Sequence, residues 1–306
     1  MTFKRSCLTK GFILAAALLV GGNALAQDDD EVDVPVTTPK GPPPDDFVNP
    51  NDAADLAYEV VPVANGGTLR GTISYTGDVP EAKRFKVEKT PEICGEEDRF
   101  IQEVEAVDGH LAGAVVLFQE VSAGKPFHNE VLMGPPPGSR AQEETSDFFM
   151  GTTLRPEKCI FGAYTSVFAN TSVIRFDNQD PVKHSPHTYE VRGVVRDTLH
   201  NQDLEGNGFL KLGINLTKGT EQVVKLECDQ HEHMQNFFRR VTNPYYAFSA
   251  ADGSYEIDQI PPGTYNVIVW HPKLGEKNME VTIAAGATAS ADFTLEEGGG
   301  RRRRRR

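Results

Sequence analysis

Residues 224–238 read VKLECDQHEHMQNFF and place one cysteine, two histidines and one methionine within seven positions. The whole chain has only 4 Cys, 8 His and 5 Met among 306 residues. Cysteine offers a soft thiolate, histidine an imidazole and methionine a thioether, and this donor set favours copper over zinc, magnesium or calcium. Cys228, His231 and Met234 are therefore candidate ligands of one metal ion, and a trigonal copper site needs a second imidazole from elsewhere in the fold.

The candidate for that second imidazole is in the stretch VIRFDNQDPVKHSPHTYEV at residues 173–191. We expect a strand to end at Asn178, a turn to follow through Pro181, and His184 to lie in the loop before the next strand. In a Greek-key sandwich, two such loops can meet at one end of the fold. The sequence therefore predicts that His184 joins the cluster at residues 228–234.

Helical periodicity is nearly absent from the chain, and short β-rich runs separated by Gly, Pro, Asn and Asp recur instead. Turn signals such as ADG at 251–253 and PPG at 261–263 punctuate these runs. The pattern predicts an all-β protein built from sandwiches, in which the run TSVFANTSVIRFDN at 165–178 is one of the expected strands.

The segment at 245–295 alternates strands with an Asp-Gly turn and a Pro-Pro-Gly turn, and it resembles the second half of the carboxypeptidase regulatory-like, transthyretin-like sandwich. The upstream stretches GGTLRGTISYTGDVPEA (66–82) and GHLAGAVVLFQE (109–120) look like the first half. Neither half has enough strands to bury a core by itself. We therefore expect one sandwich split by an inserted domain; the alternative is two small β-domains flanking a third.

Two motifs resemble the cupredoxin family: F-x-N-x-D-P-x-x-H at 176–184 and C-D-x-H-x-x-M at 228–234. The downstream stretches NPYYAFSAADG, PPGTY and VWHPKLG are similar, in the same order, to exported plastocyanin-like or methylamine-utilisation-like proteins. The resemblance covers about residues 66–297. It implies a Greek-key copper sandwich with His184, Cys228 and His231 as equatorial ligands of a single type 1 copper and Met234 as the weak axial ligand.

Two departures from the family pattern affect the surroundings of the copper. The Cys-His-Met loop is two residues shorter than in plastocyanin, and Ser185 stands where the family has an Asn that joins the two ligand loops. The residues expected to support the ligands are Asn178, Ser185, His187 and His233. His187 could also be a secondary ligand. For His233 a plain surface side chain is the favoured interpretation, and an imidazole at the solvent edge of the copper is the alternative.

Three cysteines remain after the N-terminal leader: Cys94, Cys159 and Cys228. An exported protein meets an oxidising compartment, where cysteines tend to pair. Cys94 and Cys159 have turn-like surroundings without a nearby histidine in the sequence, so we expect a Cys94–Cys159 disulfide and a metal-binding Cys228. Other pairings are open, and Cys228 as a buried free thiol is the alternative.

Both ends of the chain look unlike folded protein. Residues 1–26 have a basic start, an apolar run and an Ala-Leu-Ala end, which predicts a secretory signal peptide and a periplasmic or secreted protein. Residues 27–57 are an acidic, Pro-rich stretch and are expected to be a disordered linker, as is the Gly/Arg tail at 298–306. The expected domains are 58–145 and 244–297 for the split sandwich and 146–243 for the copper domain. No later apolar run is long enough to predict a transmembrane segment.

The chain outside the leader and the Arg tail is strongly acidic. Nine of the 31 basic residues lie in those two segments, which leaves 22 basic residues against 44 acidic ones, a net charge of about −22. This charge argues against binding nucleic acid, which requires neutralisation of phosphates. It favours a redox partner with a basic face. The six terminal arginines could contact an anionic surface.

The sequence thus predicts an exported, cupredoxin-like copper protein that transfers single electrons and is not an enzyme. One alternative is a protein for copper delivery, storage or sensing without redox turnover. The other is a structural β-sandwich binding module without functional metal. The sequence lacks the Cys-x-x-Cys-His run of a c-type haem, the Gly-x-Ser-x-Gly elbow and the Walker loop.

Overall fold

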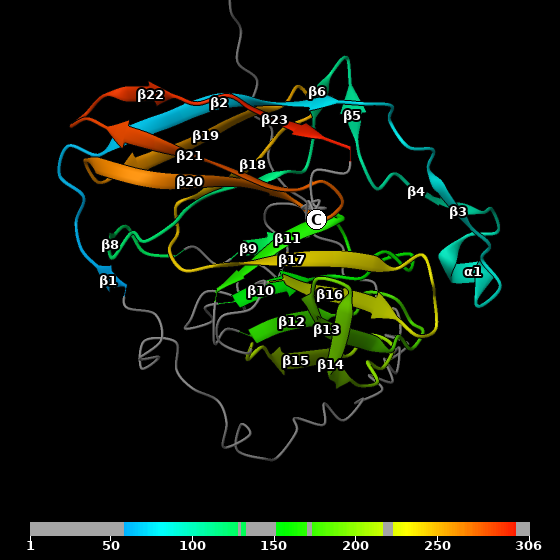
Figure 1. Ribbon diagram of the computed structural model, residues 1–306. Helices are drawn as coiled ribbons and strands as arrows, with labels where there is room; N and C mark the ends of the chain where they lie inside the picture. The colour runs from blue at the N-terminus through cyan, green and yellow to red at the C-terminus, as the bar shows by residue number, and fades with distance from the viewer. Residues whose placement is uncertain (1–57, 128–129, 133–150, 170–172, 217–222, 298–306) are drawn as a thin grey trace, which may run out of the picture. The chain divides into compact units, whose positions relative to one another are not determined.

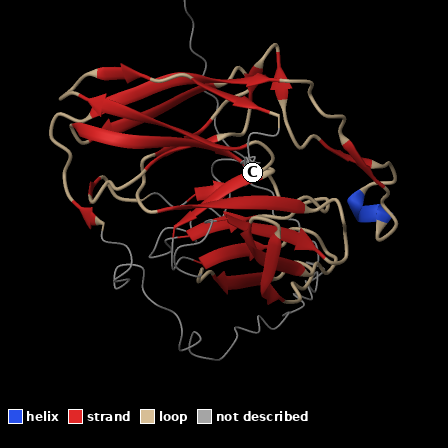
Figure 2. Cartoon of the chain, in the orientation of Figure 1, coloured by secondary structure: helices blue, strands red, loops and turns tan. Residues whose placement is uncertain are grey.

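The computed structural model describes residues 58–127, 130–132, 151–169, 173–216 and 223–297. The expected signal peptide, acidic linker and Gly/Arg tail lie outside these residues. Within the described ranges the regular structure is strand, apart from one four-residue helix, α1 (Pro91–Cys94) (Figure 2). The all-β class predicted from the sequence is confirmed. No helix in this part of the chain is long and apolar enough to cross a membrane.

The first sandwich is built from two sheets (Figure 1). One sheet has the order β18 (Tyr246–Phe248), β7 (Val115–Phe118), β20 (Gly263–His271), β21 (Gly275–Ile283). The other has the order β19 (Ser254–Ile260), β2 (Gly67–Thr76), β6 (His110–Leu111), β5 (Ala106–Val107), with β22 (Thr288–Ser290) and β23 (Phe293–Glu296) also pairing with β2. Strands from residues 67–118 and 246–296 therefore share hydrogen-bonded sheets although more than a hundred residues separate them. The domain boundaries given above stay predictions.

The second sandwich is formed by the intervening residues. Its first sheet has the order β15 (Phe209–Gly213), β12 (Val173–Asp177), β10 (Gly151–Leu154), β9 (Glu130–Leu132). Its second sheet has the order β11 (Thr165–Ala169), β17 (Gln235–Val241), β16 (Val223–Cys228), β13 (Pro186–Arg192), β14 (Val195–Asn201). The single strand expected over 165–178 is wrong: the chain changes sheets between β11 and β12, so each half of the run covers a different side of the core.

Burial patterns follow from the positions of the strands. In β19 the apolar residues alternate inward, as expected of a strand with one face in water. All four residues of β7 are buried because this strand has a core on each face. Val116 and Phe118 face the core of the first sandwich, whereas Val115 and Leu117 face a separate apolar cluster.

That separate cluster joins the two sandwiches. Ile268 and Trp270 of β20 belong to it together with Val167 of β11 and Val241 of β17. At its edge the Arg239 guanidinium lies 5.9 Å from the centre of the Trp270 ring, close enough for a cation–π contact. Burial of these apolar side chains stabilises the contact between the two sheets.

Between β2 and β5 the chain makes a long excursion away from the first sandwich. It contains β3 (Lys83–Phe85), α1 and β4 (Arg99–Ile101), and β3 and β4 form a two-stranded ribbon. Figure 1 shows this segment at the right, beyond the strands of the first sandwich. Two short strands, β1 (Glu59–Val60) and β8 (Ala123–Gly124), pair with each other in parallel.

Candidate metal centre

Two loops of the second sandwich meet at the candidate site. β13 and β16 are antiparallel neighbours with Pro186 opposite Cys228, so the loop before β13 lies against the loop after β16. The Asp229 backbone N–H donates to the Ser185 carbonyl at 3.1 Å and connects the two loops directly. The predicted ligands carried by these loops are His184, Cys228, His231 and Met234.

Three of the predicted ligands converge. The ligand atoms of His184, Cys228 and His231 all lie within 4.8 Å of one another. The Nδ1 atoms of the two imidazoles are 3.2 Å apart, and the Cys228 Sγ is 4.0 Å from His184 Nδ1 and 3.8 Å from His231 Nδ1. A thiolate and two imidazole nitrogens thus face a common point, as a trigonal metal site requires.

The site is enclosed. The exposed fraction is 0% for His184, 3% for Cys228, 5% for His231 and 1% for Met234. Met234 belongs to the same buried cluster as Cys228, which is the core of the second sandwich. Its side chain is therefore enclosed in this core, where water does not compete.

Backbone hydrogen bonds shape the short loop between β16 and β17. The Cys228 N–H donates to the Met234 carbonyl at 3.2 Å, the His231 N–H to the Cys228 carbonyl at 3.3 Å, and the Met234 N–H to the His231 carbonyl at 3.0 Å. These bonds close the loop on itself. They leave little freedom for the three side chains it carries, which favours a preorganised site.

Asp180 orients the first imidazole. Its Oδ2 lies 2.9 Å from His184 Nε2, and the carboxylate also accepts the backbone N–H groups of Lys158 at 2.6 Å and Cys159 at 2.8 Å. Burial alone would raise the pKa of Asp180, but these hydrogen bonds outweigh it and lower the pKa. An ionised Asp180 can only accept, so His184 carries a proton on Nε2, and its Nδ1 faces Cys228 and His231.

Asn178 supports the same loop through three hydrogen bonds. Its side-chain Oδ1 accepts the Asp180 N–H at 3.0 Å, and its Nδ2 donates to the carbonyls of Val182 at 2.8 Å and Glu205 at 2.9 Å. The bonds fix the turn between β12 and His184. Asn178 therefore supports the site through backbone groups of the loop and does not contact the ligand atoms directly in these bonds.

Ser185 connects the two ligand loops in spite of its short side chain. Its backbone N–H points at the Cys228 Sγ from 3.4 Å. Its hydroxyl accepts a hydrogen bond from the Gln230 side chain at 3.3 Å and donates to Asp203 Oδ1 at 3.0 Å. Gln230 thus extends from the Cys-His-Met loop to reach the serine.

Cys228 and His184 influence each other electrostatically. Burial would raise the pKa of the Cys228 thiol, but the contacts with the His184 and His231 imidazoles outweigh burial and lower it to about 6. Burial would lower the pKa of His184, but Asp180 and the Cys228 sulfur raise it to about 9. The thiolate is therefore the favoured form of Cys228 at neutral pH, which is the form that binds a metal.

The expectation that His233 is a surface side chain is wrong. His233 is only 8% exposed, and its ring centre lies 5.9 Å from that of His231. Burial, followed by the nearby charges of His231 and Arg99, lowers the pKa of His233 to about 4. The ligand loop thus holds a buried, neutral imidazole near Arg99 and the Cys159 backbone, which come from distant parts of the chain.

His187 lies apart from the converging ligands. Its ring stacks on Tyr189 with centres 4.1 Å apart, and its nitrogens are 3.1 Å from Asp229 Oδ1 and 3.1 Å from Thr198 Oγ1. Among the described residues, the groups of His, Cys and acidic side chains that could hold a metal do not include His187. Its contact with Asp229 makes it a neighbour of the loop that begins at Cys228.

The predicted pairing of Cys94 with Cys159 is present as a disulfide, and Cys228 is a buried free cysteine. The disulfide sulfurs lie within 4.8 Å of a ring nitrogen of His231, and the Cys159 sulfur lies equally near His184 and Asp180. The bond therefore contacts the candidate site. Sequence reasoning missed this proximity, and it also missed the role of Asp180, although Asp180 is part of the motif that contains His184.

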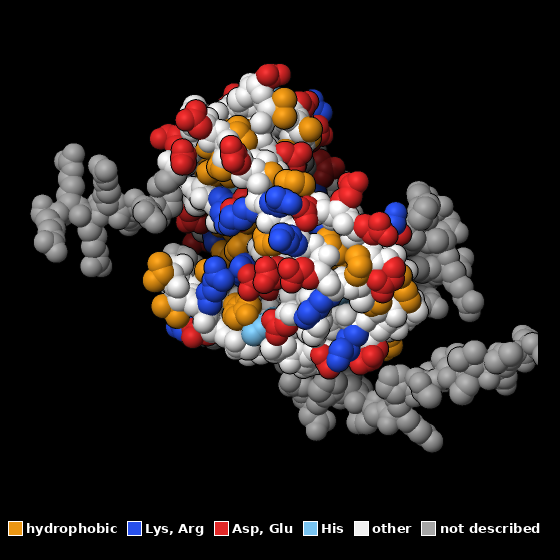
Figure 3. All heavy atoms as spheres, turned by 90° about the vertical axis from the view of Figure 1, so that its right-hand side faces the viewer, with side chains coloured by type: hydrophobic (Ala, Val, Ile, Leu, Met, Phe, Trp, Pro, Cys, Tyr) orange, Lys and Arg blue, Asp and Glu red, His pale blue; other side chains and the backbone are white. Residues whose placement is uncertain are grey.

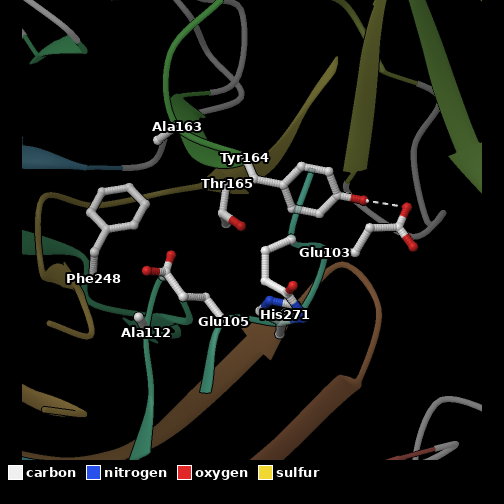
Figure 4. Close-up of a pocket in the computed structure, with 10 residues that line it drawn as sticks. Glu103, Glu105, Ala112, Ala163, Tyr164, Thr165, Phe248 and His271 are labelled. Carbon is white, nitrogen blue, oxygen red and sulfur yellow. Dashed lines mark hydrogen bonds between the residues drawn. The ribbon is translucent and has the colours of Figure 1, made fainter. Parts of the chain in front are cut away.

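A separate cavity of about 280 Å³ lies between the two sandwiches (Figure 4). Tyr164 donates its hydroxyl to Glu103 at 3.2 Å, and Lys83 and Lys273 also contact this carboxylate. The Glu105 carboxylate points into the cavity on the side of Phe248. None of the potential metal-binding groups of the described residues includes a side chain that lines this cavity.

The face seen in Figure 3 carries basic and acidic side chains close together. Ion pairs on the described surface include Arg70–Glu256, Lys183–Asp203 and Lys277–Glu296. The negative charge of the chain is therefore mixed with positive charge on this face. A partner with a basic face stays a prediction.

Comparisons with known proteins support the expected resemblance of the C-terminal segment. A family model described as the carboxypeptidase regulatory-like domain matches residues 240–296, which contain β18 to β23. This match agrees with the resemblance stated for the C-terminal segment. No curated protein matches the chain.

Solved structures that are similar to the chain include amicyanins. A reduced Cu(I) form of an amicyanin variant is 14% identical with a TM-score of 0.26, and covers 32% of this chain and 88% of that one. Amicyanin from Paracoccus versutus is 12% identical with a TM-score of 0.24, and covers 30% of this chain and 81% of that one. At these values the likeness carries no weight for the ligand assignment, which comes from the chain's own residues.

Proposed function

We propose that the protein is a copper protein that carries single electrons through one type 1 site. The equatorial ligands would be His184, Cys228 and His231, and the axial ligand Met234. The observation that carries the proposal is the convergence of one sulfur and two imidazole nitrogens within 4.8 Å in a buried position. Two His and one Cys with a weakly bound Met form the donor set of blue copper sites.

The donor chemistry of the residues fits copper. Both imidazoles present Nδ1 to the common point, and the Nε2 of His184 is already occupied by Asp180. The lowered pKa of Cys228 supplies a thiolate at neutral pH. Zinc would be satisfied by the same thiolate and imidazoles, but it has no need of a buried thioether at the fourth position.

Copper, when bound, supplies a one-electron Cu(I)/Cu(II) couple. The protein's contribution is to hold the ligands in one arrangement for both oxidation states. The closed loop from Cys228 to Met234 and the hydrogen bonds of Asp180 and Asn178 limit movement of the ligands. The Ser185 N–H near the Cys228 sulfur would stabilise negative charge on that sulfur and so tune the potential.

The proposal includes a setting for the protein. It would act outside the cytoplasm as a carrier without catalytic activity, and exchange electrons with a partner that has a basic face. The net charge of about −22 outside the leader and tail supports such a partner. Association would then become slower as salt is added.

The enclosed position of the ligands favours an electron carrier over a copper-delivery protein. All four predicted ligands are at most 5% exposed, so an incoming chelator or acceptor protein has no direct access to them. A delivery protein needs such access to release its metal. Tight retention in both oxidation states is the behaviour we expect here.

The test is to load the purified, signal-free protein with Cu(II) and record its visible and electron-spin resonance spectra. An intense thiolate-to-copper band and narrow copper hyperfine splitting would support the proposal. Cys228→Ser is the matched control and should bind copper without that band. A pale wild-type protein with wide splitting would reject the electron-transfer proposal, and copper binding in only one oxidation state would favour delivery or storage.

A further inference from the structure

The excursion between β2 and β5 leaves the first sandwich and contacts the candidate metal centre of the second. Cys94 at the end of α1 is bonded to Cys159, and Val87 and Ile93 pack against the core cluster that contains Cys228. Residues 83–101, which we term the cap, thus belong to the first sandwich by chain connection and to the second by contact.

One side chain of the cap reaches a predicted ligand. Thr90 Oγ1 lies 3.1 Å from His231 Nε2 and 3.1 Å from Cys94 Sγ. A disulfide sulfur has no hydrogen, so in the contact with Cys94 the Thr90 hydroxyl is the only possible donor. The hydroxyl oxygen is then free to accept the Nε2–H of His231.

With the Thr90 hydroxyl donating to Cys94, its oxygen accepts from His231 Nε2. In this arrangement the His231 proton lies on Nε2, and the lone pair of Nδ1 faces His184 and Cys228. Thr90 therefore has the same relation to His231 that Asp180 has to His184. Each of the two predicted imidazole ligands has its outer nitrogen in contact with a supporting side chain, while its inner nitrogen faces the other ligands.

Thr90 occupies this position in a backbone conformation that is energetically unfavourable for its residue type. Its φ is 47°, in the left-handed region, which is rare for a β-branched residue. The Ile93 and Cys94 N–H groups donate to the Thr90 carbonyl at 3.0 and 2.9 Å, and the disulfide fixes the end of the turn. Such conformations persist where the surroundings over-determine them, and they gather at binding sites.

The cap also covers the ligand loop at a second point. Lys89 Nζ donates to Gln230 Oε1 at 3.0 Å, next to His231 in the chain. The disulfide sulfurs lie within 4.8 Å of a His231 ring nitrogen. The outer edge of the imidazole thus meets Thr90 and the disulfide in place of water.

We propose that Thr90 is a positioning residue for His231, and that the disulfide-held cap slows metal exchange by covering the outer edge of this ligand. The inference rests on the proposed function, because it concerns a ligand of the proposed copper site. On this proposal, one function of the first sandwich is to supply the cap that covers the metal centre of the second sandwich.

The test compares Thr90→Val with Thr90→Ser. Valine keeps the β-branched shape but removes the hydroxyl, and serine keeps the hydroxyl. The copper-loaded proteins are mixed with excess EDTA, and loss of the thiolate-to-copper band is followed in time. Because an outer partner of a metal-binding His typically contributes 10–100-fold in affinity, we expect Thr90→Val to release copper about tenfold or more faster, with an altered electron-spin spectrum.

Thr90→Ser should release copper at a rate within about twofold of the wild type, since it retains the hydroxyl that binds His231. Thr264→Val removes an exposed hydroxyl on β20 and is the matched control, with no expected change. The double variant Cys94→Ser/Cys159→Ser frees the cap and should also speed release. Wild-type release and spectrum in Thr90→Val would overturn the inference.

A measurement without metal keeps the two proposals separate. Long-range ¹H–¹⁵N NMR of the copper-free protein reports the tautomer of each histidine, and His231 should carry its proton on Nε2 in the wild type and lose that preference in Thr90→Val. A wild-type protein that binds no copper but has this tautomer would reject the proposed function and retain Thr90 as the positioning residue. The Nδ1–H tautomer in the wild type would reject the role of Thr90.

Discussion

Asp180 Oδ2 lies 2.9 Å from His184 Nε2, and both residues are buried on the same loop, four positions apart. The same carboxylate binds two backbone N–H groups of the segment that ends in Cys159. One side chain thus connects a predicted metal ligand to the disulfide-bearing segment. The orientation of His184 and the position of the disulfide are physically coupled through Asp180.

Asp180→Asn should weaken copper binding while preserving the shape of the side chain. The amide can no longer accept through two charged oxygens, so the His184 ring loses its fixed orientation and copper affinity should fall about 10–100-fold. Competition with a chelator of known affinity measures this change. The outcome that contradicts the role of Asp180 is wild-type affinity in the variant.

The same substitution should lower stability, because Asp180 also binds the Lys158 and Cys159 N–H groups. Weakening buried hydrogen bonds to a charged acceptor typically costs about 1–3 kcal/mol. Urea unfolding of the copper-free proteins gives the free energy of unfolding. Asp203→Asn is a suitable control because Asp203 contacts Ser185 at the exposed side of the loop.

Cys228→Ser should abolish the thiolate-to-copper band and leave the fold intact, because the Cys94–Cys159 disulfide does not involve Cys228. In the copper-free protein, the pKa of His184 should fall in this variant, since the Cys228 sulfur is one of the groups that raise it to about 9. NMR titration of the His184 ring measures the shift. An unfolded variant under oxidising conditions would contradict the disulfide assignment.

Cys228 and His184 together also give the copper-free protein added stability over a limited range of pH. The lowered pKa of Cys228 contributes stability that is lost as pH falls through about 6, and the raised pKa of His184 contributes stability that is lost as pH rises through about 9. The difference in unfolding free energy between wild type and Cys228→Ser should therefore be largest between those values. If this difference in unfolding free energy does not vary with pH, an ion pair between the Cys228 thiolate and the His184 imidazolium is excluded.

Met234→Leu should keep the thiolate-to-copper band and raise the reduction potential. Leucine fills nearly the same volume at this buried position, so the loss of stability should stay below about 1.5 kcal/mol. Removing the thioether withdraws an electron donor that stabilises Cu(II) more than Cu(I), which makes reduction easier. Cyclic voltammetry of the two proteins measures the potential, and an unchanged value would argue against Met234 as the axial ligand.

Local patterns in the sequence were sufficient to predict the fold class and the convergence of residues that lie close together in the chain. Cys228 and His231 are in one short loop, and His184 follows a strand end at a distance that a Greek-key sandwich brings back to it. The disulfide could be predicted by elimination among three cysteines. These predictions use periodicity, turn chemistry and donor type, which are properties of short segments.

The remaining features depend on packing between distant segments. Thr90 lies 141 residues before His231, and nothing in its surrounding sequence indicates the contact. A surface position was the favoured interpretation for His233, but the side chain is buried near Arg99 and the Cys159 segment, which are distant in the sequence. The change of sheets between β11 and β12 is likewise invisible in a run whose β propensity is continuous.

His271 at the end of β20 should make stability fall in mild acid. It lines the cavity between the sandwiches (Figure 4), is 2% exposed, and accepts the Lys273 N–H on Nδ1 at 3.3 Å. Burial, helped by the nearby Lys273 charge, lowers its pKa to about 4. The imidazole is thus neutral in the folded protein, and its protonation in acid destabilises the folded state.

A histidine whose pKa is lowered by folding contributes stability that is complete above its unfolded pKa of about 6.5 and is lost as pH falls toward 4. With about 1.4 kcal/mol for each pKa unit, the loss is on the order of 2–3 kcal/mol. His271→Phe keeps a ring of similar size but cannot be protonated. Its unfolding free energy, measured with urea between pH 7 and pH 4, should fall less steeply than that of the wild type, and equal slopes would show that His271 is not the group that titrates.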